Sequence, residues 1–133
     1  MTGEKMKRPL LFCVAALAAA LVASQFKAPV YAAQNEPSRG AVLYKQRCAA
    51  CHAIAGKGGK VGPDLTAILG RKAGSAKFAY SPTMKASRTI WTKPNLDKFL
   101  AAPAKIVPGT RMTIAVSNAQ DREAIVNYLA TGK

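Results

Sequence analysis

The sequence predicts a single all-α domain of about four short helices, whose long loops wrap around a bulky apolar group. Three observations support this fold class. Apolar residues recur at helical spacing near both ends of the domain, no alternating stretch is long enough for an extended strand, and loops of about 11 to 18 residues join the helices. A compact domain seldom has such long loops unless they enclose something, and a chain of about 100 residues buries only a small core. We therefore expect a group that is not part of the chain to complete the core.

Residues 1–33 have the pattern of a secretory signal peptide. Three basic residues between positions 5 and 8 precede an uncharged apolar run, Leu10–Ala23, and small residues follow it. The run is shorter than the roughly 20 residues that a membrane-spanning helix needs, so we predict a removed signal rather than a permanent anchor. Cleavage can follow position 24, 32 or 33. The mature protein is then one domain, residues 34–133, and Cys13 is lost with the signal.

The first helix is predicted within the stretch NEPSRGAVLYKQRCAACH, residues 35–52. Gly40, Tyr44, Cys48 and Cys51 are spaced by 4, 4 and 3 positions, and this spacing places them on one helical face. The cysteine pair therefore belongs near the end of the helix.

The middle of the domain is predicted to be mostly loop. Residues 53–63 contain four glycines and a proline without apolar periodicity, which is typical of a loop. Residues 64–70, DLTAILG, suit a short helix that is capped by Asp64 and ended by Gly70. Residues 71–88 show no clean period, and we predict a long irregular loop there.

Two further helices are predicted in the C-terminal part. Residues 92–103, TKPNLDKFLAAP, have a proline in the first turn and apolar residues on one face, and Pro103 ends the helix. Residues 104–116 contain a Pro-Gly turn dipeptide and are predicted to form an extended loop. Residues 117–133 begin with Ser117 and have glutamine three positions later, a capping-box pattern, and apolar residues follow at helical spacing.

The charge of the chain is strongly positive. The net charge is +14, and loss of residues 1–33 removes four basic residues and one acidic residue, which leaves +11. A small domain of this charge attracts acidic proteins, anionic membrane surfaces and nucleic acid, and it raises encounter rates with them. Because export argues against nucleic acid, we expect acidic partner proteins, with weak contact to anionic membranes as a further option.

The only histidine of the chain, His52, directly follows the pair Cys48 and Cys51. A Cys-x-x-Cys-His run is the attachment signature of c-type haem. Two thiols at this spacing can reach the two vinyl groups of one porphyrin, and the adjoining imidazole can bind its iron. A redox dithiol would need a thioredoxin-like βαβ setting, a zinc site would need a fourth ligand, and a disulfide this short would add little stability. We therefore predict one covalently attached haem.

The iron also needs a ligand on the other face of the haem. A thioether there raises the reduction potential relative to two nitrogen ligands. Outside the signal the candidates are Met84 and Met112. Met112 follows the Pro-Gly turn in an extended loop that can lay a side chain across a flat ring, whereas Met84 follows Pro82 in the irregular loop. These residues alone leave the choice open, because a lone methionine more often fills a core.

The motifs resemble those of class I cytochromes c, the small soluble cytochromes of mitochondria and bacteria. The shared motifs occur in the family's order: CAACH, GPDL at 62–65, Trp91, PGTRM at 108–112 and NYL at 127–129. The resemblance covers essentially all of residues 38–133. It implies the cytochrome c fold, in which helices and long loops enclose one haem, and it implies that Gly40 and Tyr44 pack against Ile125 and Tyr128.

The resemblance also implies roles for residues of the site. It makes Met112 the sulfur ligand opposite His52, and it makes Pro63 the residue whose carbonyl accepts a hydrogen bond from His52 and fixes its tautomer. Thr110 is implied as the hydroxyl beside the methionine. The residues implied to hold the haem propionates are Arg71, Tyr80 and Trp91.

Two phenylalanines depart from the family pattern. Phe99 stands where many relatives have a tyrosine that bonds to the methionine sulfur, and Phe78 stands where some have another propionate tyrosine. Each change removes a hydroxyl, so the family's reduction potential does not carry over. The stretch FAYSPTM, residues 78–84, resembles bacterial members and agrees with an exported protein.

We interpret the sequence as that of a periplasmic single-haem carrier of one electron, which cycles between Fe(II) and Fe(III). Two strong axial ligands would leave no open position for a substrate, so we expect no enzymatic activity. Acidic redox proteins, such as a membrane oxidase, a reductase or a dehydrogenase, are the expected partners of a monomer. The alternatives are the haem subunit of a dehydrogenase and a peroxidase-like or gas-binding protein with a labile sixth ligand.

Overall fold

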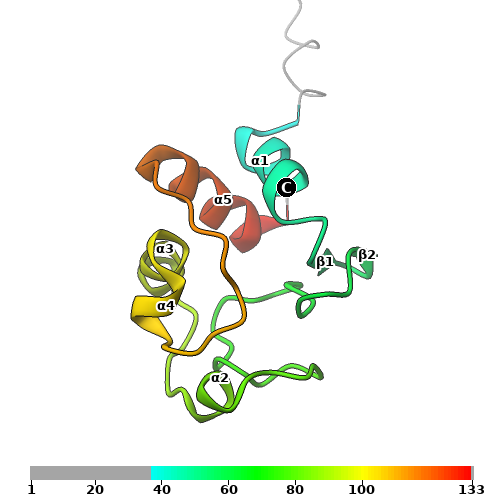
Figure 1. Ribbon diagram of the computed structural model, residues 1–133. Coiled ribbons are helices and arrows are strands. Elements are labelled where there is room, and N and C mark those ends of the chain that lie inside the picture. Colours follow the sequence, from blue (N-terminus) through cyan, green and yellow to red (C-terminus); the bar gives the residue numbers. More distant parts are fainter. Residues whose placement is uncertain (1–36, 133) are drawn as a thin grey trace, which may run out of the picture.

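The computed structural model describes residues 37–132, so the predicted signal peptide lies outside the described residues. The elements within this range are five helices and a two-stranded antiparallel sheet: α1 (Arg39–Arg47), β1 (Ala53–Ile54), β2 (Lys57–Gly58), α2 (Pro82–Ala86), α3 (Lys93–Ala101), α4 (Pro103–Ile106) and α5 (Ala119–Thr131). Helix α5 packs against both α1 and α3, and α2 lies at the opposite end of the molecule from α1 (Figure 1). The predicted architecture of helices and long loops is confirmed. No helix within residues 37–132 has the length and apolar character needed to cross a membrane.

Helices α1 and α5 are in close contact at Gly40. A Cβ atom at Gly40 would lie 2.2 Å from the Ala124 carbonyl oxygen and 2.7 Å from Tyr128 Cβ. One turn further along α1, the rings of Tyr44 and Tyr128 lie with their centroids 5.3 Å apart. The predicted packing of Gly40 and Tyr44 against Tyr128 is therefore confirmed.

Gly40→Ala should destabilise the protein by about 2 kcal/mol, because overpacking a tight contact costs more than the helix propensity of alanine returns. The obstructing atom belongs to the backbone of α5, so the two helices must separate to admit the methyl group. The midpoint of urea unfolding measures the effect. Val42→Ala is the control, since Val42 lies on the same helix and is 38% exposed. Equal midpoints for the two variants would contradict the close crossing.

Helix α5 begins one residue later than the sequence predicts. Asn118, and not Ser117, is the N-cap, and its side-chain oxygen accepts a hydrogen bond from the Asp121 amide at 3.0 Å. The Ser117 carbonyl instead accepts a hydrogen bond from Arg122 at 2.8 Å. Gly132 ends the helix with φ 69, in the left-handed region that glycine favours.

The predicted helix at residues 64–70 is wrong, because this stretch forms turns. The Asp64 side chain accepts hydrogen bonds from the amide and the hydroxyl of Thr66, which gives the backbone an alternative to a helix. Ala67 has φ 49, a left-handed conformation that a helix interior does not contain. The Leu65 amide also donates to the Ala53 carbonyl at 2.8 Å and ties the stretch to the hairpin.

Two short helices were missed by the sequence patterns. Helix α2 lies inside the predicted irregular loop, where the Ser81 hydroxyl caps it by accepting from the Met84 amide at 3.3 Å. Helix α4 starts at Pro103, which therefore begins one helix as well as ending another. Only the start of the 71–88 segment is paired with Trp91: the Gly70 amide donates to the Trp91 carbonyl and the Trp91 amide donates to the Arg71 carbonyl, both at 2.9 Å.

Candidate functional site

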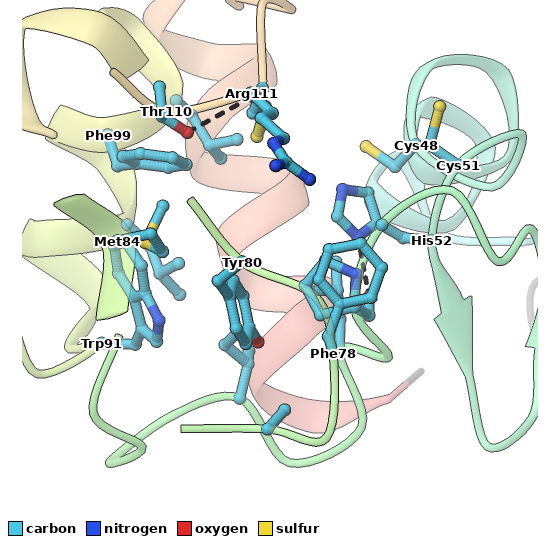
Figure 2. Close-up of a pocket in the computed structure, with 18 of the residues that line it drawn as sticks. Cys48, Cys51, His52, Phe78, Tyr80, Met84, Trp91, Phe99, Thr110 and Arg111 are labelled. Carbon is cyan, nitrogen blue, oxygen red and sulfur yellow. Dashed lines mark hydrogen bonds between the residues drawn. The ribbon is translucent and has the colours of Figure 1, made fainter. Parts of the chain in front are cut away.

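The domain contains a cavity of about 390 Å³, and Figure 2 shows side chains that line it. Helices α1, α2, α3 and α5 and the loops between them contribute its walls. All nine residues that the sequence singles out for the site line this cavity: Cys48, Cys51, His52, Pro63, Arg71, Tyr80, Trp91, Thr110 and Met112. Segments that are more than 60 positions apart in the chain thus meet at one cavity.

The two cysteines lie at the end of α1, where the chain makes one more turn. The Cys48 amide donates to the Tyr44 carbonyl and the His52 amide donates to the Cys48 carbonyl, both at 2.8 Å. Both thiols are free and half-buried. Figure 2 shows the two sulfur atoms on the same side of the cavity as the His52 ring. The turn therefore presents two thiols and one imidazole together, as attachment of a porphyrin requires.

The alternatives for the cysteine pair fit this environment less well. Burial raises the pKa of Cys48 to about 11, and the smaller effect of Arg47 only partly opposes it. A redox dithiol needs the opposite, an activated thiolate with a lowered pKa. Among residues 37–132 no three His, Cys, Asp or Glu side chains are grouped so that they could hold a metal ion.

His52 is held in one orientation. Its Nδ1 donates a hydrogen bond to the Pro63 carbonyl at 2.8 Å, so Nε2 keeps the lone pair with which imidazole binds a metal. A Cβ atom at Gly62 would lie 2.4 Å from His52 Cε1, so a side chain there would collide with the ring. The Tyr44 hydroxyl donates to the His52 carbonyl at 2.9 Å, and burial raises the pKa of Tyr44 to about 12. The Gly62-Pro63 motif thus fixes the orientation of the His52 ring through one hydrogen bond and one close backbone contact.

Met112 lines the cavity from the loop between α4 and α5. Its amide donates to the Thr110 hydroxyl at 3.3 Å, which places that hydroxyl beside the methionine. Gly109 has φ 79, and its turn packs against Thr83 at the start of α2. Arg111 donates to the Ala79 carbonyl at 3.2 Å, so the loop is also fastened to the segment before α2.

Met84 lines the same cavity and is 8% exposed. It belongs to the hydrophobic core and lies beside Trp91 (Figure 2). The ring centroids of Trp91 and Phe99 are 4.9 Å apart. Phe99 therefore lines this part of the cavity with an aromatic ring that has no hydroxyl. Both thioethers are therefore at the cavity, one in the packed core and one on a loop.

The polar part of the wall carries positive charge. The basic residues that line the cavity are Arg47, Arg71, Lys72 and Arg111, and none of the lining residues in the described part of the chain is acidic. Arg71 donates to the Asp64 carbonyl at 2.9 Å, and its backbone pairs with that of Trp91. Burial raises the pKa of Tyr80, and nearby Arg71 partly opposes this rise. Cations and neutral donors of this kind suit the carboxylates of a haem.

The apolar walls were only partly predicted. Leu96, Phe99 and Leu100 were expected on one face of a helix, and that face of α3 lines the cavity. Ile68 and Val116, 6% and 1% exposed, lie in stretches without usable periodicity and could not be recognised. The complete set, with two thiols, an oriented imidazole, two thioethers, apolar walls and four cations, fits a covalently bound haem.

Comparison with known proteins gives the same result. The family profile described as "Cytochrome c" matches residues 37–133. Cytochrome c of Theileria annulata is 41% identical over 99 residues, which cover 72% of this chain and 85% of the relative. Cytochrome c of Tetrahymena pyriformis is 42% identical over 97 residues, and that of Arabidopsis thaliana is 37% identical over 99; each match covers 72% of this chain and 88% of the relative.

Proposed function

The chain belongs to the cytochrome c family and is an electron carrier with one covalently bound haem c. We propose that His52 and Met112 are the two residues that hold its iron. We also propose that the protein works in the periplasm. The observation that carries the first proposal is the meeting of Cys48, Cys51, His52 and Met112 at one cavity. A haem held by these residues would supply the chemistry, the gain and loss of one electron by its iron.

The residues of the site keep this chemistry to electron transfer. The Pro63 carbonyl holds the His52 ring and its tautomer, so Nε2 is available throughout the cycle. The Thr110 hydroxyl and the Arg111 contact to Ala79 hold the loop from which Met112 reaches the cavity. If His52 and Met112 both hold the iron, they would leave no position open to a substrate. We therefore propose that the protein has no enzymatic activity of its own.

The periplasmic location is supported by the signal pattern of residues 1–33, which lie outside the described residues. The three relatives described above are eukaryotic and add no support for a bacterial compartment. An exported carrier with a net charge of +11 would be attracted to acidic surfaces of membrane redox proteins.

The mouth of the cavity has the properties of a docking surface for acidic redox proteins. Val61 and Ile114 line the cavity and yet are 76% and 51% exposed, so both lie at its edge. Lys60 precedes Val61 and is exposed, while Lys72 and Arg111 are exposed members of the cavity wall. Apolar contact surrounded by cations favours close approach of an acidic partner in one orientation.

The rate of electron transfer should therefore depend strongly on salt. With ferricyanide, a small anionic oxidant, the second-order rate constant should fall about tenfold between low and high ionic strength, because salt screens attraction at the cavity mouth. A cationic cobalt(III) oxidant should show the opposite slope. Stopped-flow oxidation of the reduced protein measures both. The same assay with membranes of the source organism then identifies the acceptor.

Charge reversal at single lysines locates the attraction. Lys60→Glu and Lys72→Glu should slow the ferricyanide reaction several-fold at low salt, because both positions are exposed near the cavity mouth. Lys93→Glu is the matched control, since Lys93 is exposed and donates to Asn127 of α5 instead. Equal effects at all three positions would show that only the overall charge matters and that the mouth does not guide docking.

A further inference from the structure

The loop that carries Met112 is anchored at each end by a buried valine. Val107 is 3% exposed and Val116 is 1% exposed, whereas residues 113–115 between Met112 and Val116 are exposed. The Val107 amide donates to a carbonyl of α4 at 2.9 Å, and the Val116 amide donates to the Leu100 carbonyl of α3 at 2.8 Å. The position of Met112 therefore depends on how firmly these two ends are held.

Arg122 of α5 strengthens the anchor at the Val116 end. Its side chain is 14% exposed and makes three hydrogen bonds. The guanidinium donates to the carbonyls of Val116 at 3.1 Å and Ser117 at 2.8 Å, and it donates to the Asp97 carboxylate of α3 at 2.8 Å. The three bonds come from two nitrogens of one rigid, planar guanidinium, Nε and Nη1, so a single group fixes all three acceptors relative to one another. One side chain thus joins α5, α3 and the end of the loop.

We propose that Arg122 is a positioning residue that keeps the Met112 loop closed over the cavity. The proposal rests on the proposed function, in which Met112 is the second axial ligand. Val116 itself lines the cavity only four positions after Met112, so release of this end would free the exposed stretch between them. Local opening of such a segment needs only its own anchors to break. Arg122 should therefore control loop opening more strongly than it controls the stability of the helices.

Arg122→Met tests the proposal in the ferric holoprotein, because methionine keeps a long apolar stem and removes all three hydrogen bonds. Arg39→Met is the matched control. Arg39 also pairs with an acidic residue of α5, Asp121, but Arg39 belongs to α1. Within residues 37–132, its hydrogen bond and ion pair do not involve the Met112 loop. Asp121 keeps Arg47 at 3.9 Å in that variant, so it does not lose every partner.

Amide hydrogen exchange is the first readout, and it is independent of the identity of the axial ligand. Exchange of the Val116 amide, which donates to the Leu100 carbonyl, should accelerate about tenfold in Arg122→Met and stay unchanged in Arg39→Met, while α1 exchanges alike in both. Equal acceleration in the two variants, or none in Arg122→Met, would overturn the proposal. If Arg122→Met does not yield folded holoprotein, Asp97→Ala removes only the ion pair, and it should still accelerate exchange of the Val116 amide. No acceleration would also overturn the proposal.

Carbon monoxide binding to the reduced protein is the second readout. Arg122→Met should bind carbon monoxide at a measurable rate, whereas Arg39→Met, like the unsubstituted protein, should show no spectral change, because only the first variant frees the loop. In a Met112→Ala background, Arg122→Met should not raise the binding rate further. A further rise in that background would mean that Arg122 does not act through Met112. Failure of Met112→Ala itself to admit carbon monoxide would instead overturn the ligand assignment, and the exchange data would still decide the role of Arg122.

Discussion

Replacing Met112 by alanine should abolish the weak near-infrared charge-transfer band of a sulfur–iron bond and should let carbon monoxide or cyanide bind at neutral pH. The physical reason is that alanine has no donor atom, while Met112 reaches the cavity from a loop whose neighbours at positions 111 and 113–115 are exposed. Small ligands can then enter where the thioether was. Near-infrared absorption of the ferric protein and carbon monoxide titration of the ferrous protein measure the two effects.

Met84→Ala is the control for this experiment. Met84 is 8% exposed and packs in the hydrophobic core, so its truncation should lower the free energy of unfolding by about 2 to 5 kcal/mol and leave the near-infrared band in place. Urea unfolding and the same spectrum separate these effects. If Met84→Ala loses the band and Met112→Ala keeps it, then Met84 is the ligand and our assignment of the loop is wrong.

Replacing both Cys48 and Cys51 by alanine should remove the covalent haem completely. The two thiols lie on one turn beside the His52 ring, and they are the only cysteines within residues 37–132. Without the haem the cavity of about 390 Å³ loses its filling, so the purified chain should also unfold at much lower urea concentration. Mass spectrometry and acid-acetone extraction measure attachment. The unsubstituted chain should keep its haem through extraction.

Cys13→Ala is the control for the cysteine pair. Cys13 lies in the predicted signal, outside the described residues, so its replacement should leave haem attachment unchanged. Haem that stays covalently bound to the chain without Cys48 and Cys51 would show that attachment occurs elsewhere.

The longer helices could be predicted from the sequence, and the short elements could not. Helices α1, α3 and α5 contain at least nine residues each, so their apolar faces repeat often enough to be recognised. Helices α2 and α4 contain five and four residues, fewer than any periodic pattern needs. The stretch at 64–70 failed for another reason, because Asp64 bonds to Thr66 in a turn where the sequence suggested a helix cap.

The candidate site was easier to predict than the fold around it. Cys48, Cys51 and His52 are adjacent in the chain and have chemistry that few other groups share, so a short motif identifies them. Arg122 has no such signal. Its partner Asp97 lies 25 positions away, and its other two acceptors are backbone carbonyls, which every residue possesses. Contacts of this kind become visible only in three dimensions.

Our central claim is that His52 and Met112 close both axial positions, so that the iron exchanges electrons and binds no small ligand. Carbon monoxide added to the reduced, unsubstituted protein at neutral pH tests this claim most directly. We predict that its visible spectrum does not change, while a one-electron oxidant oxidises the same sample fully and reversibly. Prompt formation of a carbon monoxide complex would contradict the claim and would favour a gas-binding or peroxidase-like protein with a labile sixth ligand.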